Sequence, residues 1–162
     1  MRYFCAIAAC VIGLHGPAAA RAGSSAPAFY TRDTVKTTRE VVEDLEFAIT
    51  ERNFRVTGRM HVGRGIRERG LAEFPDYEVI LFCNLGFARQ MLELDPSYIN
   101  YCPGRVTVRR DRDRTVISAP LLPEPDANRP LAEVTRRINS YIRDIVDYGT
   151  EQWSPAVELP VN

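Results

Sequence analysis

The sequence predicts a single small α+β domain, with about five strands in a mainly antiparallel or mixed sheet and helices packed on one face. Three observations lead to this class. Several short segments are apolar or alternate polar and apolar residues, as strands do. Two long segments carry apolar stripes at helical spacing. The elements follow the order strand, helix, strand, short turn, strand, helix, strand, strand, helix, without an internal repeat.

The first 22 residues predict a signal peptide. Met1 and Arg2 form a basic start, an apolar run follows, and Ala20-Arg21-Ala22 is a typical cleavage site. The apolar run is too short to span a bilayer. We therefore expect a periplasmic or secreted protein with no membrane span after cleavage near Ala22. The expected organisation is signal peptide 1–22, lead-in 23–28, domain 29–149 and tail 150–162.

The charge balance argues against a nucleic-acid partner. The whole chain has 21 basic and 21 acidic residues. Cleavage removes two arginines and no acid, which leaves the mature chain slightly acidic and without a global basic field. Lys36 is the only lysine. The abundance of arginine fits either genomic base composition or anion recognition by guanidinium groups.

The first half of the domain predicts two strands around one helix. Residues 29–36 form a candidate strand, and Thr37 with Glu40 forms a capping box for an amphipathic helix from Thr38 to Arg52. The segment Phe54 to Val62 alternates cleanly. One predicted face carries Phe54, Val56, Gly58, Met60 and Val62, and the other carries Arg55, Thr57, Arg59 and His61.

The next segment, Gly63 to Pro75, predicts a loop with a short helical turn around Ile66 to Arg69. Gly63-x-Gly65 follows a strand, but position 68 is Glu68, so the third glycine of a dinucleotide-binding motif is missing. This pattern excludes nucleotide binding of that kind.

The central stretch from Glu78 to Arg110 organises the chain. Its apolar run, Val79 to Cys83, predicts a strand in the middle of the sheet with both faces covered. Asn84 is the expected N-cap of a helix that Asp95-Pro96 stops. Cys102-Pro103-Gly104 predicts a turn, and Arg105 to Arg110 a half-buried strand.

The last third predicts a hairpin strand and a long helix. Asp111-Arg112-Asp113 is the expected hairpin turn before a strand from Thr115 to Ala119. A proline-rich linker follows, and Pro130 suits the first turn of a helix that Gly149 caps. This helix either covers the sheet or pairs with its copy in a dimer, and we favour the first because the sheet must be covered.

The central stretch resembles the DUF302 family, a domain of unknown function. The matching pieces are Phe82-Cys83-Asn84 with Ala88, Leu94-Asp95-Pro96, and Arg105-Val106-Thr107-Val108. His61 also falls where some members place a histidine. The resemblance covers about Tyr30 to Ser118. It implies the family's fold and a tendency to form small dimers, hence a homodimer, and it implies no activity. This chain has Leu85 where the family has proline, and Cys102-Pro103 in place of a Pro-Cys turn.

Two groups of residues are candidate sites. If the second and fourth strands share a sheet, Arg55, Arg59, Arg105 and Arg109 point to one side with His61 at its edge. They would bind an anionic ligand or a partner, or else form a solvated face. Cys83, Cys102 and His61 are the redox or metal candidates, with Asn84 in the adjoining turn. They lack zinc-site and covalent-haem spacings, so copper and non-covalent haem remain open, and the cofactor is unknown.

We expect a binding domain rather than an enzyme. No G-x-S-x-G motif is present, and His61 is the only histidine after cleavage. The redox or metal-handling accessory protein and the structural dimeric module are the alternatives.

The relation of the two cysteines depends on topology. A crossover helix between parallel strands would separate them by roughly 20 Å. Antiparallel strands would place both at one end of the sheet, and the family's paired turns imply this arrangement. A disulfide is then within reach, and a reduced Cys83 beside the helix N-terminus is expected to have a lowered pKa.

Overall fold

The computed structural model describes residues 28–151 and confirms the predicted order of elements. The short helical turn expected around Ile66 to Arg69 is instead a helix that begins at Val62, and an additional short 3-10 helix, η1, follows the helix that ends at Leu94. The elements are β1 (Phe29–Thr34), α1 (Thr38–Glu51), β2 (Arg55–His61), α2 (Val62–Arg67), β3 (Tyr77–Cys83), α3 (Leu85–Leu94), η1 (Pro96–Tyr101), β4 (Gly104–Asp111), β5 (Arg114–Pro120) and α4 (Arg129–Tyr148).

The five strands form one sheet in the order β1-β5-β4-β3-β2, and each neighbouring pair is antiparallel. The predicted α+β class is therefore confirmed, with an antiparallel sheet. β3 lies between β4 and β2, as its apolar run predicts. Since β3 and β4 run antiparallel, the chain that joins them starts and ends at the same end of the sheet.

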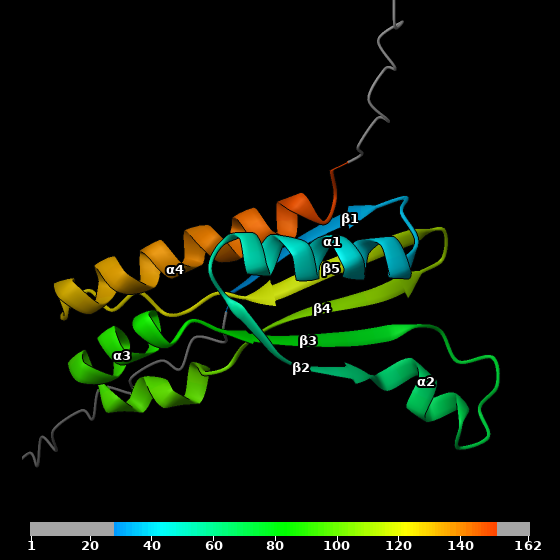
Figure 1. Cartoon of the computed structure of the whole chain (residues 1–162), viewed down its shortest axis with the longest axis horizontal. Coiled ribbons are helices and arrows are strands. Elements are labelled where there is room, and N and C mark those ends of the chain that lie inside the picture. Colours follow the sequence, from blue (N-terminus) through cyan, green and yellow to red (C-terminus); the bar gives the residue numbers. More distant parts are fainter. Residues whose placement is uncertain (1–27, 152–162) are drawn as a thin grey trace, which may run out of the picture.

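Helices α1 and α4 lie on one face of the sheet, as expected (Figure 1). α4 contacts α1, α3, β1 and β5, so it covers the sheet. The core between these layers contains Val41, Leu45 and Ile49 of α1, Ile80 and Phe82 of β3, Val106 and Val108 of β4, Ile117 of β5, and Ile138, Ile142 and Ile145 of α4. The two ends of the sheet differ, because α3 and η1 lie at one end and α2 at the other (Figure 1).

The helix caps follow the predicted chemistry. The Thr37 hydroxyl accepts a hydrogen bond from the Glu40 amide at 3.3 Å, and the Thr37 amide donates to the Glu40 carboxylate at 2.8 Å. Gly149 ends α4 with an ordinary helical φ of −61°, so the expected left-handed cap is not formed. A Cβ there would lie 3.0 Å from side-chain atoms of Leu45 and Ile117, so glycine permits close packing instead.

The predicted alternation along β2 is wrong beyond Val56, because a β-bulge interrupts the strand between Val56 and Gly58. Arg55 lies opposite Cys83, but beyond the bulge Arg59 lies opposite Ile80 and His61 opposite Glu78. Because one extra residue reverses the side on which all later side chains lie, Arg59 and His61 share the helix-covered face with Ile80.

The other face of the sheet is only partly covered. Val79, Leu81 and Cys83 alternate with the buried Ile80 and Phe82, and they are half-buried. The expectation that both faces of β3 are covered is therefore wrong within residues 28–151. We call this second side of the sheet the open face.

The predicted signal peptide 1–22 lies outside the described residues, as do most of the lead-in and most of the tail. Within residues 28–151, no helix is both long and apolar enough to cross a membrane.

Candidate functional site

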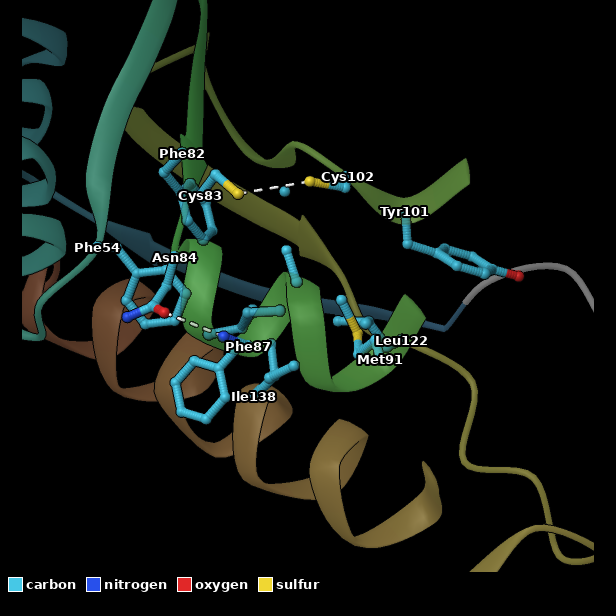
Figure 2. Close-up of a pocket in the computed structure, with 13 residues that line it drawn as sticks. Phe54, Phe82, Cys83, Asn84, Phe87, Met91, Tyr101, Cys102, Leu122 and Ile138 are labelled. Carbon is cyan, nitrogen blue, oxygen red and sulfur yellow. Dashed lines mark hydrogen bonds between the residues drawn. The ribbon is translucent and has the colours of Figure 1, made fainter. Parts of the chain in front are cut away.

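The two cysteines of the domain meet at the α3 end of the sheet. Cys83 is the last residue of β3, and Cys102 directly follows η1. Their Sγ atoms are 3.4 Å apart and share a hydrogen bond (Figure 2). Both residues are free thiols and half-buried. The same-end geometry expected from the family resemblance is confirmed, even though the Cys-Pro turn is inverted relative to the family pattern.

The N-caps of α3 and η1 fix the course of the chain between the two cysteines. The Asn84 side chain accepts a hydrogen bond from the Phe87 amide at 3.1 Å and donates one to the Asn53 carbonyl at 2.8 Å. It therefore starts α3 directly after Cys83, as predicted, and ties this turn to the loop before β2. Asp95 caps η1 by accepting from the Ser97 amide at 2.9 Å, which leads the chain back to Cys102.

Behind the thiols lies a small apolar cavity of about 40 Å³. Figure 2 shows Phe87 and Met91 among its lining residues, below the cysteine pair, and Phe82 beside Cys83. The Phe54 ring packs between those of Phe82 and Tyr141, each at a centroid distance of 5.7 Å. Ligand pockets usually measure roughly 300–1,000 Å³, so this cavity is too small for a haem group. This aromatic cluster was not predicted, because its rings come from β3, α3, α4 and the loop before β2, which are distant in the sequence.

The cavity makes the environment of Cys83 unfavourable for a thiolate. Burial first, and then the hydrogen bond to Cys102 and the Cys102 charge, together raise the pKa of Cys83 to about 11. The expectation of a lowered pKa beside the α3 N-terminus is therefore wrong.

One groove is lined by Cys83, and a second lies beside the residues that precede and follow Cys102. The first has a volume of about 580 Å³ and is lined by Asn53, Phe54, Arg55, Thr57, Cys83, Asn84 and Leu85. The other has a volume of about 150 Å³ and is lined mainly by residues of the 100–105 and 120–122 segments, Tyr101, Pro103 and Arg105 among them. Each groove therefore contains one of the predicted arginines.

The four predicted arginines do not share one face. Arg55, Arg105 and Arg109 lie opposite Cys83, Leu81 and Tyr77 respectively, which places them on the open face. Arg59 lies on the helix-covered face because of the bulge. There it forms ion pairs with Glu46 of α1 at 3.4 Å and with Glu78 at 3.3 Å.

His61 lies far from the cysteines. Its Nδ1 is 2.7 Å from the Glu78 carboxylate, and Glu78 is five residues before Cys83 along β3, a distance of roughly 17 Å. A metal site that uses Cys83, Cys102 and His61 together is therefore not formed. Among residues 28–151, no group of three or more histidine, cysteine or acidic residues could hold a metal ion.

Sequence reasoning missed the bulge, although a signal for it exists. An isolated glycine within a strand pattern often marks a bulge, and Gly58 is such a glycine. It also missed Glu78, whose carboxylate joins Arg59 and His61 and so occupies both residues in contacts within the fold.

Comparisons with known proteins agree with this fold. No curated protein matched the sequence. A crystal structure of an uncharacterized conserved DUF302 protein from Bacillus stearothermophilus is similar, with a TM-score of 0.64 and 23% identity. The similarity covers 74% of this chain and 96% of that one, and at this identity it shows the fold alone. The family model described as domain of unknown function DUF302 matches residues 30–147. Because that match spans most of the sequence, this chain belongs to the DUF302 family.

Proposed function

We propose that this chain is an exported domain whose Cys83–Cys102 pair cycles between dithiol and disulfide forms. The 3.4 Å separation of the two Sγ atoms carries the proposal. A disulfide bond measures about 2.05 Å, so the sulfurs need to approach each other by only about 1.4 Å. The pair is also half-buried beside open grooves, which leaves a path for a reaction partner.

The exchange needs a disulfide as oxidant. One protein sulfur attacks the partner disulfide, and the first partner thiol leaves with one proton. The second protein sulfur then attacks the mixed disulfide and releases the second partner thiol with the other proton. Two electrons and two protons thus pass from the protein to the partner. Because burial raises the pKa of Cys83 and so disfavours its thiolate, we assign the first attack to Cys102 and the second to Cys83.

Export fits this chemistry. The predicted signal peptide would bring the domain to a compartment in which disulfides form and persist. The homodimer implied by the family resemblance stays a prediction, and the proposed exchange does not require it.

The test uses the full-length chain, expressed in a bacterium and purified from the periplasmic fraction. Its intact mass should begin at or near Gly23. After equilibration in glutathione buffers of graded potential and denaturation, both thiols should disappear in one two-electron transition. We expect a midpoint between about −270 and −120 mV, the range of exchange-active pairs.

A Cys83→Ser, Cys102→Ser variant is the control for labelling at other sites. Two labelled thiols per chain at every potential would refute the exchange. A disulfide that glutathione does not reduce would instead show a purely structural bridge and would equally refute the proposal. A full-length cytoplasmic product would refute export.

A further inference from the structure

The arginines of the sheet fall into two classes. Those with hydrogen-bond or ion-pair partners are Arg32, Arg59, Arg109, Arg110 and Arg114. Arg55 and Arg105 have no such partner among residues 28–151 and are exposed. Since most guanidinium groups in this sheet find a carboxylate or carbonyl group, the two exceptions point to an acceptor outside the described fold.

Both unpaired arginines flank the thiol pair. On β2, Arg55 lies directly opposite Cys83 of β3. On the other side of β3, Arg105 lies opposite Leu81, which shares the open face with Cys83. Neighbouring strands are about 4.8 Å apart, and the β3 partners of the two arginines are two residues apart along the strand, so the two arginine backbones lie roughly 12 Å from each other, across the strand that ends in Cys83.

The surfaces around these arginines favour a small anion. Neither groove is lined by an acidic residue. The first groove also contains the start of α3, where the helix dipole adds partial positive charge. The volumes of about 580 and 150 Å³ suit a small molecule better than a folded partner.

We infer that the oxidant of the Cys83–Cys102 pair is a low-molecular-weight disulfide whose two halves carry carboxylate groups, and that Arg55 and Arg105 bind these carboxylates. This inference rests on the proposed thiol–disulfide exchange. Cys102 attacks one sulfur of the small disulfide, and the first carboxylate-bearing thiol leaves with a proton. Cys83 then attacks the Cys102 sulfur in the mixed disulfide, which forms the protein disulfide and releases the second thiol with the second proton.

The test measures the oxidation rate of the reduced mature protein by three disulfides of similar size. These are dithiodiglycolate, which is anionic, bis(2-hydroxyethyl) disulfide, which is neutral, and cystamine, which is cationic. Each rate is divided by the rate of the same probe with the urea-unfolded protein, which removes differences in intrinsic reactivity. We expect dithiodiglycolate to exceed cystamine by about tenfold at low salt, and this ratio to shrink as salt screens the charges.

Matched variants assign the preference to the two arginines. An Arg55→Met, Arg105→Met double variant should lose the anionic preference and keep its rate with the neutral probe. Arg109→Met should keep the preference, because Arg109 lies toward the other end of the open face and pairs with Asp111 at 2.8 Å. Equal urea midpoints of all variants verify that each one folds.

The outcomes separate the two proposals. If the neutral probe oxidises the pair but charge makes no difference, or if the double variant keeps the preference, the anionic assignment is wrong and the exchange stands. If no probe forms the Cys83–Cys102 disulfide, both proposals fail. A much faster reaction with an acidic disulfide-linked peptide than with dithiodiglycolate would overturn the assignment to a small molecule.

Discussion

At the α2 end of the sheet, Arg59 and His61 share the carboxylate of Glu78, whereas at the α3 end Arg55 and Arg105 have no partner within residues 28–151. The first end also ties the sheet to α1, through the ion pair between Arg59 and Glu46. The second end holds the two thiols, the apolar cavity and the grooves. Arg55 and Arg59, four residues apart on β2, therefore differ in role: Arg59 forms ion pairs within the fold, and Arg55 lies beside the thiols.

The two ends show that a paired arginine and an unpaired arginine have different roles. A guanidinium group that already contacts two carboxylates stabilises the fold and has little capacity left for a ligand. An exposed and unpaired guanidinium group beside a reactive pair has that capacity. The following predictions test the difference between the two ends of the sheet, from the largest expected effect on stability to the smallest.

The largest effect is expected at Gly63, which begins the α2 end just after β2. A Cβ at this position would lie 2.7 Å from the Tyr77 backbone nitrogen and against the Pro75 carbonyl oxygen. Because backbone atoms cannot move aside as a side chain can, Gly63→Ala should destabilise the protein by roughly 3 kcal/mol in urea unfolding. Gly65→Ala is the matched control, since its nearest neighbour is the end of the flexible Arg69 side chain at 3.4 Å. Equal midpoints for the two variants would contradict the close approach.

An intermediate effect should separate Arg59 from Arg55. Arg59→Met removes both ion pairs and leaves Glu78, whose side chain is only 12% exposed, with His61 alone. We expect a loss of about 1 kcal/mol. Arg55→Met should change stability by less than about 0.5 kcal/mol, because its side chain has no partner within residues 28–151 to lose. Urea unfolding of both variants at one salt concentration measures the difference, and a larger loss at Arg55 would reverse our division of the two ends.

The smallest effect concerns pH and the reduced Cys83. Its pKa is raised from an ordinary 9.0 to about 11 in the folded protein, first by burial and then by Cys102. The folded state therefore holds this proton more tightly than the unfolded state. The resulting stability is fully present below pH 9 and is lost as the pH rises towards 11.

The measurement compares urea midpoints of the reduced wild type and of Cys83→Ser across this pH range. The wild type should lose more stability than the variant, whereas tyrosine ionisation affects both equally. The effect should be modest, because the thiol is only half-buried. Parallel pH curves for the two proteins would show that burial does not raise the pKa of Cys83.

Much of the fold follows from local patterns in the sequence. The Thr37–Glu40 capping box, the Asn84 cap and the Asp95-Pro96 stop each involve residues within a few positions of one another, so their chemistry is visible in one dimension. The apolar stripes of α1 and α4 likewise predict the faces that these helices bury. The order of elements and the α+β class rest on such signals.

The candidate site was only partly predictable. Cys83, Cys102, Arg55 and Arg105 are recognisable from the sequence as residues with useful chemistry. The bulge in β2 removed Arg59 and His61 from the predicted group, because a single extra residue reverses the sides of a strand. The pairing of Arg109 with Asp111, two residues further along β4, also changes its expected role.

The sequence by itself determined the order of the five strands and of the main helices, and that two cysteines and several arginines are present near strand ends. Only the tertiary structure decided that the thiols lie 3.4 Å apart, that the Cys83 environment is apolar, and that Arg55 and Arg105 have no partner among residues 28–151. The physical reason is the separation along the chain of the groups that interact. Helix caps and periodicity depend on neighbours in the chain, whereas burial, ion pairing and strand register depend on groups that the antiparallel sheet brings together from distant segments.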